Sequence, residues 1–270
     1  MWETIKNEFA AKVAVCLFLI LTIWWVILSL SGIQEQFENY LFGATYGLMA
    51  AWGGFWGITI AKHWGGAKSV LGKAILALSF GLLAAEFGQI VFSYYNIFSG
   101  VEVPYPSLAD VGFFANIPLY TIGIILLAKA SGIQFTLKKL SSKLQAVLLP
   151  ATMLVFSYFF FLQGYEVDWT DPVRVFLDFG YPLGQALYVS IALLVYVLSK
   201  NILGGVMRVK ILFLLFAFVA QYLADYNFLF QNSRGTWLNA GYGDYLYLLA
   251  YFIMTLGLLQ LKTLYNSLKK

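Results

Sequence analysis

Long apolar stretches joined by short connections set the narrowest limit on how this chain can fold. Eight such stretches cover residues 11–32, 40–62, 71–97, 111–130, 144–164, 173–198, 204–230 and 244–264. A helix needs about 20 mostly apolar residues to cross a bilayer, and a helix satisfies its own backbone hydrogen bonds there. The sequence therefore predicts an all-α integral membrane protein with eight transmembrane helices, in which residues 1–270 form a single polytopic domain surrounded by the lipid bilayer.

The basic residues predict how these helices are oriented. Fifteen of the 17 lie at one set of helix ends: Lys6, Lys12, Lys62, Lys68, Lys73, Lys129, Lys138, Lys139, Lys143, Lys200, Arg208, Lys210, Lys262, Lys269 and Lys270. Cytoplasmic loops of membrane proteins carry the excess of lysine and arginine. We therefore predict that both termini are cytoplasmic. The net charge of +4 comes from residues scattered over these ends, so the sequence does not predict binding to nucleic acid.

Two of the predicted helices share a pattern that suggests an internal repeat. Asp110, Thr121 and Gly123 recur at the same offsets as Asp244, Thr255 and Gly257. A parallel repeat of four helices plus four, related by an axis along the membrane normal, is one interpretation of this match. A chance coincidence of three positions is the other.

Ionisable and amide side chains inside the apolar stretches are the main indication of function. Such groups cost several kcal/mol in hydrocarbon unless they are paired or hydrated. Glu86, Asp178 and Asp225 lie at a similar depth in the predicted outer halves of three helices. Their polar neighbours follow at helical spacings of three or four residues, so each set occupies one helix face. We expect these faces to converge on a polar interior that opens to the extracytoplasmic side.

The predicted site contains ten residues, which would form an acidic, aromatic-lined pocket for a small cationic ligand, an ion or a proton. They are Glu86, Gln89, Asp110, Asn116, Asp178, Tyr181, Gln185, Gln221, Asp225 and Asp244. A structural role is the alternative, in which the acids hydrogen-bond to neighbouring side chains and hold the helices together. For Asp110, Asp171 and Asp244 that alternative is helix capping, because each lies where a helix is expected to begin.

Other features exclude several classes of function. A single cysteine, Cys16, and a single histidine, His63, provide neither a disulfide framework nor a zinc site, and we predict no metal ligands. The sequence contains no Walker loop, GxSxG elbow or HExxH motif. It names no catalytic residue and identifies no cofactor.

Several segments of the second half of the chain resemble a known family. They are PYPSLADVGFFANIPLYTIGIILL, YPLGQAL, and LADYNFLF followed by AGYGDYLYLLAYFIMTLGL. These segments resemble the multipass N-terminal membrane domains of bacterial diguanylate cyclases and related signalling proteins. The resemblance implies a sensory module in a prokaryotic cytoplasmic membrane. No GGDEF-like output segment is present before the last residue, Lys270. Any signal is therefore expected to pass to a separate signalling protein at the cytoplasmic face.

We predict from these observations a non-enzymatic membrane sensor or ligand-binding protein. A cation- or proton-coupled transporter of small solutes is an alternative, and a membrane-embedded lipid-modifying enzyme is a second one. A cavity closed toward the cytoplasmic side favours binding and sensing. A polar path that reaches the basic face, or two repeat halves able to move against each other, favours transport.

Overall fold

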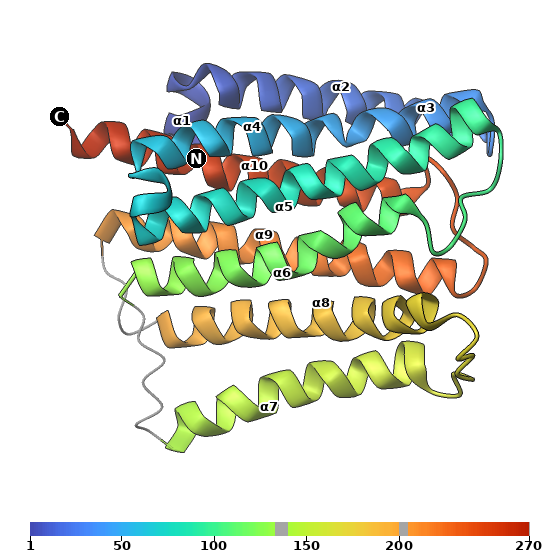
Figure 1. The fold of residues 1–270 in the computed structure, drawn as a ribbon. Helices are drawn as coiled ribbons and strands as arrows, with labels where there is room; N and C mark the ends of the chain where they lie inside the picture. The colour runs from blue at the N-terminus through green and yellow to red at the C-terminus, as the bar shows by residue number, and fades with distance from the viewer. Residues whose placement is uncertain (133–139, 200–204, 270) are drawn as a thin grey trace.

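The computed structural model describes residues 1–132, 140–199 and 205–269, and the regular secondary structure of this part of the chain is helical, with no strand (Figure 1). Seven helical segments within it are long and apolar enough to cross a membrane. Helices of this kind place the protein in a lipid bilayer. The chain is therefore an integral, multipass membrane protein.

The predicted second stretch is divided into two helices in the structure. It contains α3 (Phe37–Tyr46) and α4 (Leu48–His63), with Gly47 between them. Glycine lowers helix propensity, and here it also leaves room for the carboxyl group of Glu86, which approaches the backbone at this point. α4 has 16 residues and is not one of the seven long segments. An eighth span would require α3 and α4 to cross the membrane together, and this stays a prediction.

The other predicted stretches correspond to single long helices whose ends differ from the prediction by a few residues. These helices are α2 (Phe9–Ser31), α5 (Val70–Ser93), α6 (Leu108–Ala130), α7 (Leu140–Ser157), α8 (Pro172–Ser199), α9 (Gly205–Asn232) and α10 (Tyr242–Leu268). Two of them end in a wider, π-helical turn: η2 (Tyr94–Ser99) follows α5, and η3 (Tyr158–Leu162) follows α7. A short helix, α1 (Trp2–Asn7), precedes α2, and η1 (Gly66–Lys68) lies between α4 and α5.

The two halves of the chain use the same order of helix contacts. In the first half α2 packs against α4, α4 against α5 and α5 against α6, while in the second half α7 packs against α8, α8 against α9 and α9 against α10. The halves meet through α4 with α10 and through α6 with α8, and α2 also packs against α10. The matched glycines also have matched partners, since a Cβ at Gly123 would meet Leu78 of α5 and a Cβ at Gly257 would meet Leu214 of α9. Gly–Leu contacts thus join the last two helices of each half.

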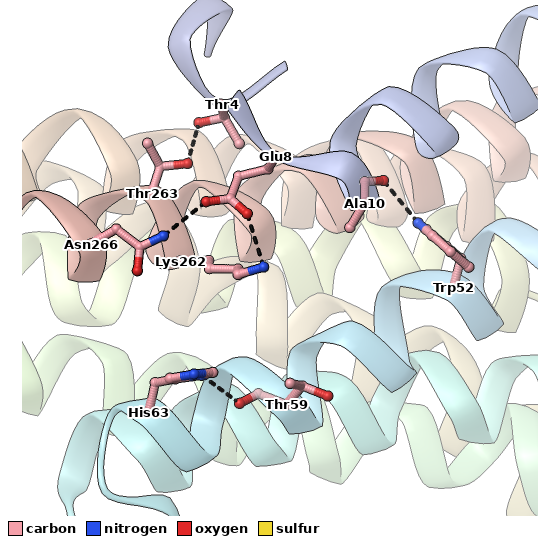
Figure 2. A network of polar contacts seen from close by, with 9 residues as sticks. All are labelled: Thr4, Glu8, Ala10, Trp52, Thr59, His63, Lys262, Thr263 and Asn266. Carbon is pink, nitrogen blue, oxygen red and sulfur yellow. Dashed lines mark hydrogen bonds and ion pairs between the residues drawn. The ribbon is translucent and has the colours of Figure 1, made fainter. Parts of the chain in front are cut away.

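Both termini lie at one end of the bundle, where α1 packs against α10 (Figures 1 and 2). Thr263 donates a hydrogen bond to Thr4, and Lys262 forms an ion pair with Glu8. The connections after α5, α7 and α9 lie at the opposite end (Figure 1). The structure does not describe residues 133–139, 200–204 and 270, or the side chains of 140–143, 199 and 205–208. Some of the basic residues that predict the cytoplasmic side therefore lie outside the described part: Lys138, Lys139, Lys143, Lys200, Arg208 and Lys270.

Candidate functional site

A cavity of about 510 Å³ lies in the half of the bundle farthest from the termini. We call it the polar cavity. The helices α3, α5, α6, α8, α9 and α10 form its walls, and the connections after α5, α7 and α9 contribute Tyr105, Tyr165 and Trp237. Nine of the ten predicted site residues line it: Gln89, Asp110, Asn116, Asp178, Tyr181, Gln185, Gln221, Asp225 and Asp244.

Glu86 is the predicted residue that does not line the polar cavity. Its carboxyl group points toward the interruption between α3 and α4, and a Cβ at Gly47 would lie 2.0 Å from Glu86 Oε2. That oxygen is buried without a hydrogen-bond partner. Gln89, one turn further along α5, does reach the cavity. The structure therefore separates Glu86 from Asp178 and Asp225.

Asp178 forms the mouth of the cavity together with two tyrosines from connecting segments. Its Oδ1 accepts a hydrogen bond from Tyr105 at 2.8 Å, and its Oδ2 accepts one from Tyr165 at 2.5 Å. The hydrogen bond to Asp178 raises the pKa of the Tyr165 hydroxyl to about 12. Burial, reinforced by the hydrogen bond to the same carboxylate, raises the pKa of Tyr105 well above its usual range. Arg174, one turn earlier on α8, lies 3.8 Å from Asp178 Oδ2. Through its two tyrosine hydrogen bonds, the Asp178 carboxylate joins the connections after α5 and α7 to the start of α8.

Asp110 joins the start of α6 to α8. The chain enters α6 through a capping box, in which Ser107 is the N-cap and Asp110 Oδ2 accepts the backbone N–H of Ser107 at 2.7 Å. The other oxygen, Oδ1, accepts the hydroxyl of Tyr181 at 2.8 Å. Asp110 therefore has the capping role considered from the sequence and an inter-helix contact as well.

Asp225 is the deepest carboxylate of the polar cavity. Tyr188 donates to its Oδ2 at 2.7 Å, Gln221 donates to its Oδ1 at 3.0 Å, and Tyr247 lies nearby in the lining of the cavity. Tyr188 in turn packs edge-on against Tyr120, which packs against Phe218, and all three are fully buried. Through Tyr188, Asp225 is therefore connected to a fully buried aromatic cluster.

Asp244 begins α10 in the same way that Asp110 begins α6. Its Oδ2 accepts the backbone N–H of Ala240 at 2.7 Å, and Tyr46 of α3 lies beside its side chain. The Tyr46 hydroxyl also lies 2.9 Å from Gln89 Oε1, and Gln89 donates to the carbonyl oxygen of Gly43. A tyrosine from another helix thus meets the capping carboxylate in each half of the protein.

Three of the four aspartates of the cavity, Asp110, Asp178 and Asp225, accept a hydrogen bond from at least one tyrosine hydroxyl, and Tyr46 lies beside the fourth, Asp244. Sequence reasoning included Tyr181 but missed Tyr46, Tyr105, Tyr165 and Tyr188. Tyr188 could have been found, because it continues the spacing of Asp178, Tyr181 and Gln185 along one face of α8. Tyr105 and Tyr165 lie in irregular connections, where no periodicity indicates which way a side chain points.

Charge in the polar cavity is strongly unbalanced. Its lining includes the carboxylates of Asp110, Asp178, Asp225 and Asp244 and one basic side chain, Arg174. Aromatic rings, among them Phe113, Phe161 and Tyr247, form much of the remaining wall. Carboxylates and the faces of aromatic rings both attract cations. Within the described part of the chain, no three His, Cys, Asp or Glu side chains come close enough together to hold a metal ion.

A larger hollow, of about 810 Å³, is a groove along α7 and α8. Its lining is apolar: Leu154, Val167, Trp169, Pro172, Val175, Phe176, Phe179, Gly180, Leu183, Gly184 and Leu187. None of the predicted site residues contributes to it. Such a surface matches lipid acyl chains and offers no polar group to fix a solute.

No known family model matches this chain, and comparisons with curated proteins and with solved structures give no match either. The resemblance to membrane domains of diguanylate cyclases therefore stays a prediction. The fold and the site define a helical integral membrane protein with an acidic, tyrosine-rich cavity in one half of the bundle.

Proposed function

We propose that this protein is a ligand-binding membrane protein of the sensor type, which binds a small organic cation in the polar cavity. The observation that carries this proposal is that the cavity extends from the connections at one end to the middle of the bundle and ends there. On α10 its lining stops at Tyr251, and the next inward-facing residues, Met254 and Leu258, are buried. Tyr120, Tyr188 and Phe218, on the other helices, are fully buried and do not line it.

The charge of the cavity supports a cation as the ligand. The lining of the cavity contains four carboxylates and one guanidinium. Burial in a medium of low dielectric constant strengthens the attraction of these carboxylates for a positive charge. The aromatic walls supply cation–π contacts and an apolar surface for the body of an organic ligand.

The mouth of the cavity suggests how binding could change the protein. A cation near Asp178 would compete with Tyr105 and Tyr165 for the same carboxylate oxygens. Loss of either hydrogen bond would free a connection between helices, and the relative positions of α6 and α8 would then change. The signal would leave through a separate signalling protein at the basic face, as we expect from the sequence.

A binding experiment tests the proposal directly. Purified protein in detergent should show a rise in thermal stability, and heat in a calorimetric titration, with a panel of organic cations that contains primary amines and quaternary ammonium compounds. Asp225→Asn keeps the shape of the deepest carboxylate and removes its charge, so it should weaken binding by about tenfold, which is about 1.4 kcal/mol. Asp168→Asn removes an exposed carboxylate outside the cavity and should leave binding unchanged. A panel without any binder in the wild type would refute the proposal.

The orientation of the protein needs a separate test. In a Cys16→Ser background, single cysteines at the exposed positions Glu102, Glu166 and Ser233 should react with a membrane-impermeant maleimide in intact cells. Cysteines at Lys68 and Lys269, at the other end of the bundle, should react only after the membrane is permeabilised. The reverse pattern would place the mouth of the polar cavity in the cytoplasm.

Transport is the second candidate, and the matched packing of the two halves favours it. Each half joins its last two helices through one glycine and one leucine, and each capping aspartate meets a tyrosine from the other half. Two similar halves around a central site are a common design of secondary transporters. Uptake of a bound amine into proteoliposomes, abolished by Asp225→Asn, would favour transport over sensing. Binding without uptake would favour sensing.

A further inference from the structure

Two amide side chains of the polar cavity have hydrogen-bonding capacity that the protein itself does not use. Asn116 of α6 and Gln185 of α8 both line the cavity, and each is 6% exposed. Their oxygens, Asn116 Oδ1 and Gln185 Oε1, are buried and have no hydrogen-bond partner. Buried polar atoms are nearly always paired, so two free oxygens on helices that pack together need a reason.

The carboxylates of the cavity differ from these amides because the protein already supplies their partners. Asp110 accepts Tyr181, Asp178 accepts Tyr105 and Tyr165, and Asp225 accepts Tyr188 and Gln221. A ligand that donated a hydrogen bond to one of these carboxylates would have to share an oxygen with a donor that the protein already supplies. The aspartates therefore supply negative charge, while the free acceptors are the amides.

A terminal amide can present either of its two ends to a ligand. A half turn about its last bond exchanges oxygen and nitrogen with almost no change in shape. Asn116 and Gln185 can therefore turn their oxygens toward the cavity when a hydrogen-bond donor enters. Each oxygen would then gain the partner that it lacks in the free protein.

We propose that Asn116 and Gln185 determine specificity by accepting hydrogen bonds from an ammonium group that carries N–H bonds, so that the ligand is a primary or secondary amine and not a quaternary ammonium compound. This inference rests on the proposed function of the cavity and narrows it. A quaternary ammonium group has the same charge but no N–H, so it would leave both oxygens unpaired. The aspartates would attract both kinds of cation, and the amides would distinguish them.

Three probes with one apolar body test the inference: phenethylamine, its N,N,N-trimethyl derivative and 2-phenylethanol. Calorimetric titration of the wild-type protein should show phenethylamine binding at least about tenfold more tightly than the trimethyl compound, the change expected for one hydrogen bond to a charged donor. The alcohol lacks the positive charge and should bind most weakly. Equal affinities for the two cations would overturn the inference while leaving a cation-binding cavity in place. Failure of all three probes would count against both the inference and the proposed function.

Matched variants assign the preference to the two amides. Asn116→Leu and Gln185→Met preserve approximate size and remove the acceptor, so each should reduce the preference for phenethylamine to about threefold or less. Binding of the trimethyl compound should change less than binding of phenethylamine, and the thermal unfolding midpoint of each variant shows separately that it is folded. Gln260→Met is the control, because Gln260 is a buried amide with an unpartnered nitrogen that does not line the cavity. A preference that persists in both cavity variants, or that falls equally in Gln260→Met, would overturn the inference.

Discussion

Tyr181 of α8 donates a hydrogen bond to Asp110 Oδ1 at 2.8 Å, while Oδ2 of the same carboxylate accepts the backbone N–H of Ser107 at 2.7 Å. One side chain therefore caps α6 and also connects α6 to α8. Because α6 belongs to the first half of the chain and α8 to the second, this hydrogen bond crosses the interface between the halves.

Tyr181→Phe should lower the stability of the protein by about 1 kcal/mol, because the substitution removes one hydrogen bond to a partly exposed carboxylate. Asp110→Ala should cost more, by about a further 1 kcal/mol, since it also removes the cap of α6. Reversible unfolding in mixed micelles measures both changes. Tyr242→Phe alters an exposed tyrosine at the same end of the bundle and is the control. Equal costs for Tyr181→Phe and Tyr242→Phe would show that the contact between Tyr181 and Asp110 adds no stability.

The effect of Gly47→Ala on the stability of the protein should change sign when the residue at position 86 is changed. Alanine in place of glycine favours a helix by about 1 kcal/mol, but overpacking costs about 1–3 kcal/mol. A Cβ at Gly47 would lie 2.0 Å from Glu86 Oε2 and 3.2 Å from Gln89 Cγ. We therefore expect Gly47→Ala to destabilise the wild type by about 1 kcal/mol and to stabilise a Glu86→Ala variant by a similar amount.

Gly43→Ala provides the matched control for this prediction. The nearest atom to a Cβ at Gly43 is Asn239 Oδ1 at 3.7 Å, which is an ordinary contact. Gly43→Ala should therefore be stabilising in both backgrounds. If Gly47→Ala were equally destabilising with and without the Glu86 carboxyl group, the close approach of that carboxyl would not explain the interruption between α3 and α4.

The sequence predicted those parts of the site that depend on local periodicity. Asp178, Tyr181 and Gln185 follow one another at spacings of three and four residues, and all three line the polar cavity. Spacing of this kind fixes which residues share a helix face whatever the helix packs against. The same reasoning placed Gln221 and Asp225 together, and a hydrogen bond of 3.0 Å joins them.

The remainder depends on contacts that no local pattern contains. Glu86 has the depth expected of a site residue, but the rotation of α5 against α4 directs its carboxyl toward Gly47. The tyrosines that donate to Asp178 come from connections whose course is set by the whole bundle. Periodicity indicates a face of a helix, and only the packing of helices determines what that face meets.

The contact between Tyr165 and Asp178 predicts a tyrosine titration at high pH. A neutral hydroxyl donates to the carboxylate, so the hydrogen bond favours the protonated tyrosine and raises its pKa to about 12. The stability that this contact contributes is therefore complete below about pH 10, the ordinary pKa of tyrosine, and is lost as the pH rises through about 12. Ultraviolet absorbance of tyrosinate should lose its step near pH 12 in Tyr165→Phe.

Asp178→Asn should move the Tyr165 step from near pH 12 toward the ordinary value, because the negative acceptor is gone. Asp171→Asn removes a neighbouring carboxylate that does not contact Tyr165 and should leave the step in place. If Tyr165→Phe instead removed a step in the tyrosinate absorbance near pH 10, the hydrogen bond at the mouth of the cavity would be absent in solution.

The ion pair of Glu8 with Lys262 predicts strong coupling between the two ends of the chain (Figure 2). Lys262 Nζ lies 2.9 Å from Glu8 Oε2, Asn266 donates to Glu8 Oε1 at 2.9 Å, and Glu8 is 7% exposed.

Lys262→Met should cost about 3 kcal/mol, because it leaves a buried carboxylate with the amide of Asn266 alone. Glu8→Gln should cost less, since Lys262 keeps its contact with the Trp56 ring at 4.8 Å and is partly in water. The double variant should be more stable than the sum of the single costs predicts, by about 1–3 kcal/mol in a double-mutant cycle of unfolding free energies. Lys12→Met, which changes an exposed lysine of α2, is the control and should have little effect. Additive costs for Glu8→Gln and Lys262→Met would contradict a direct interaction between α10 and the start of the chain.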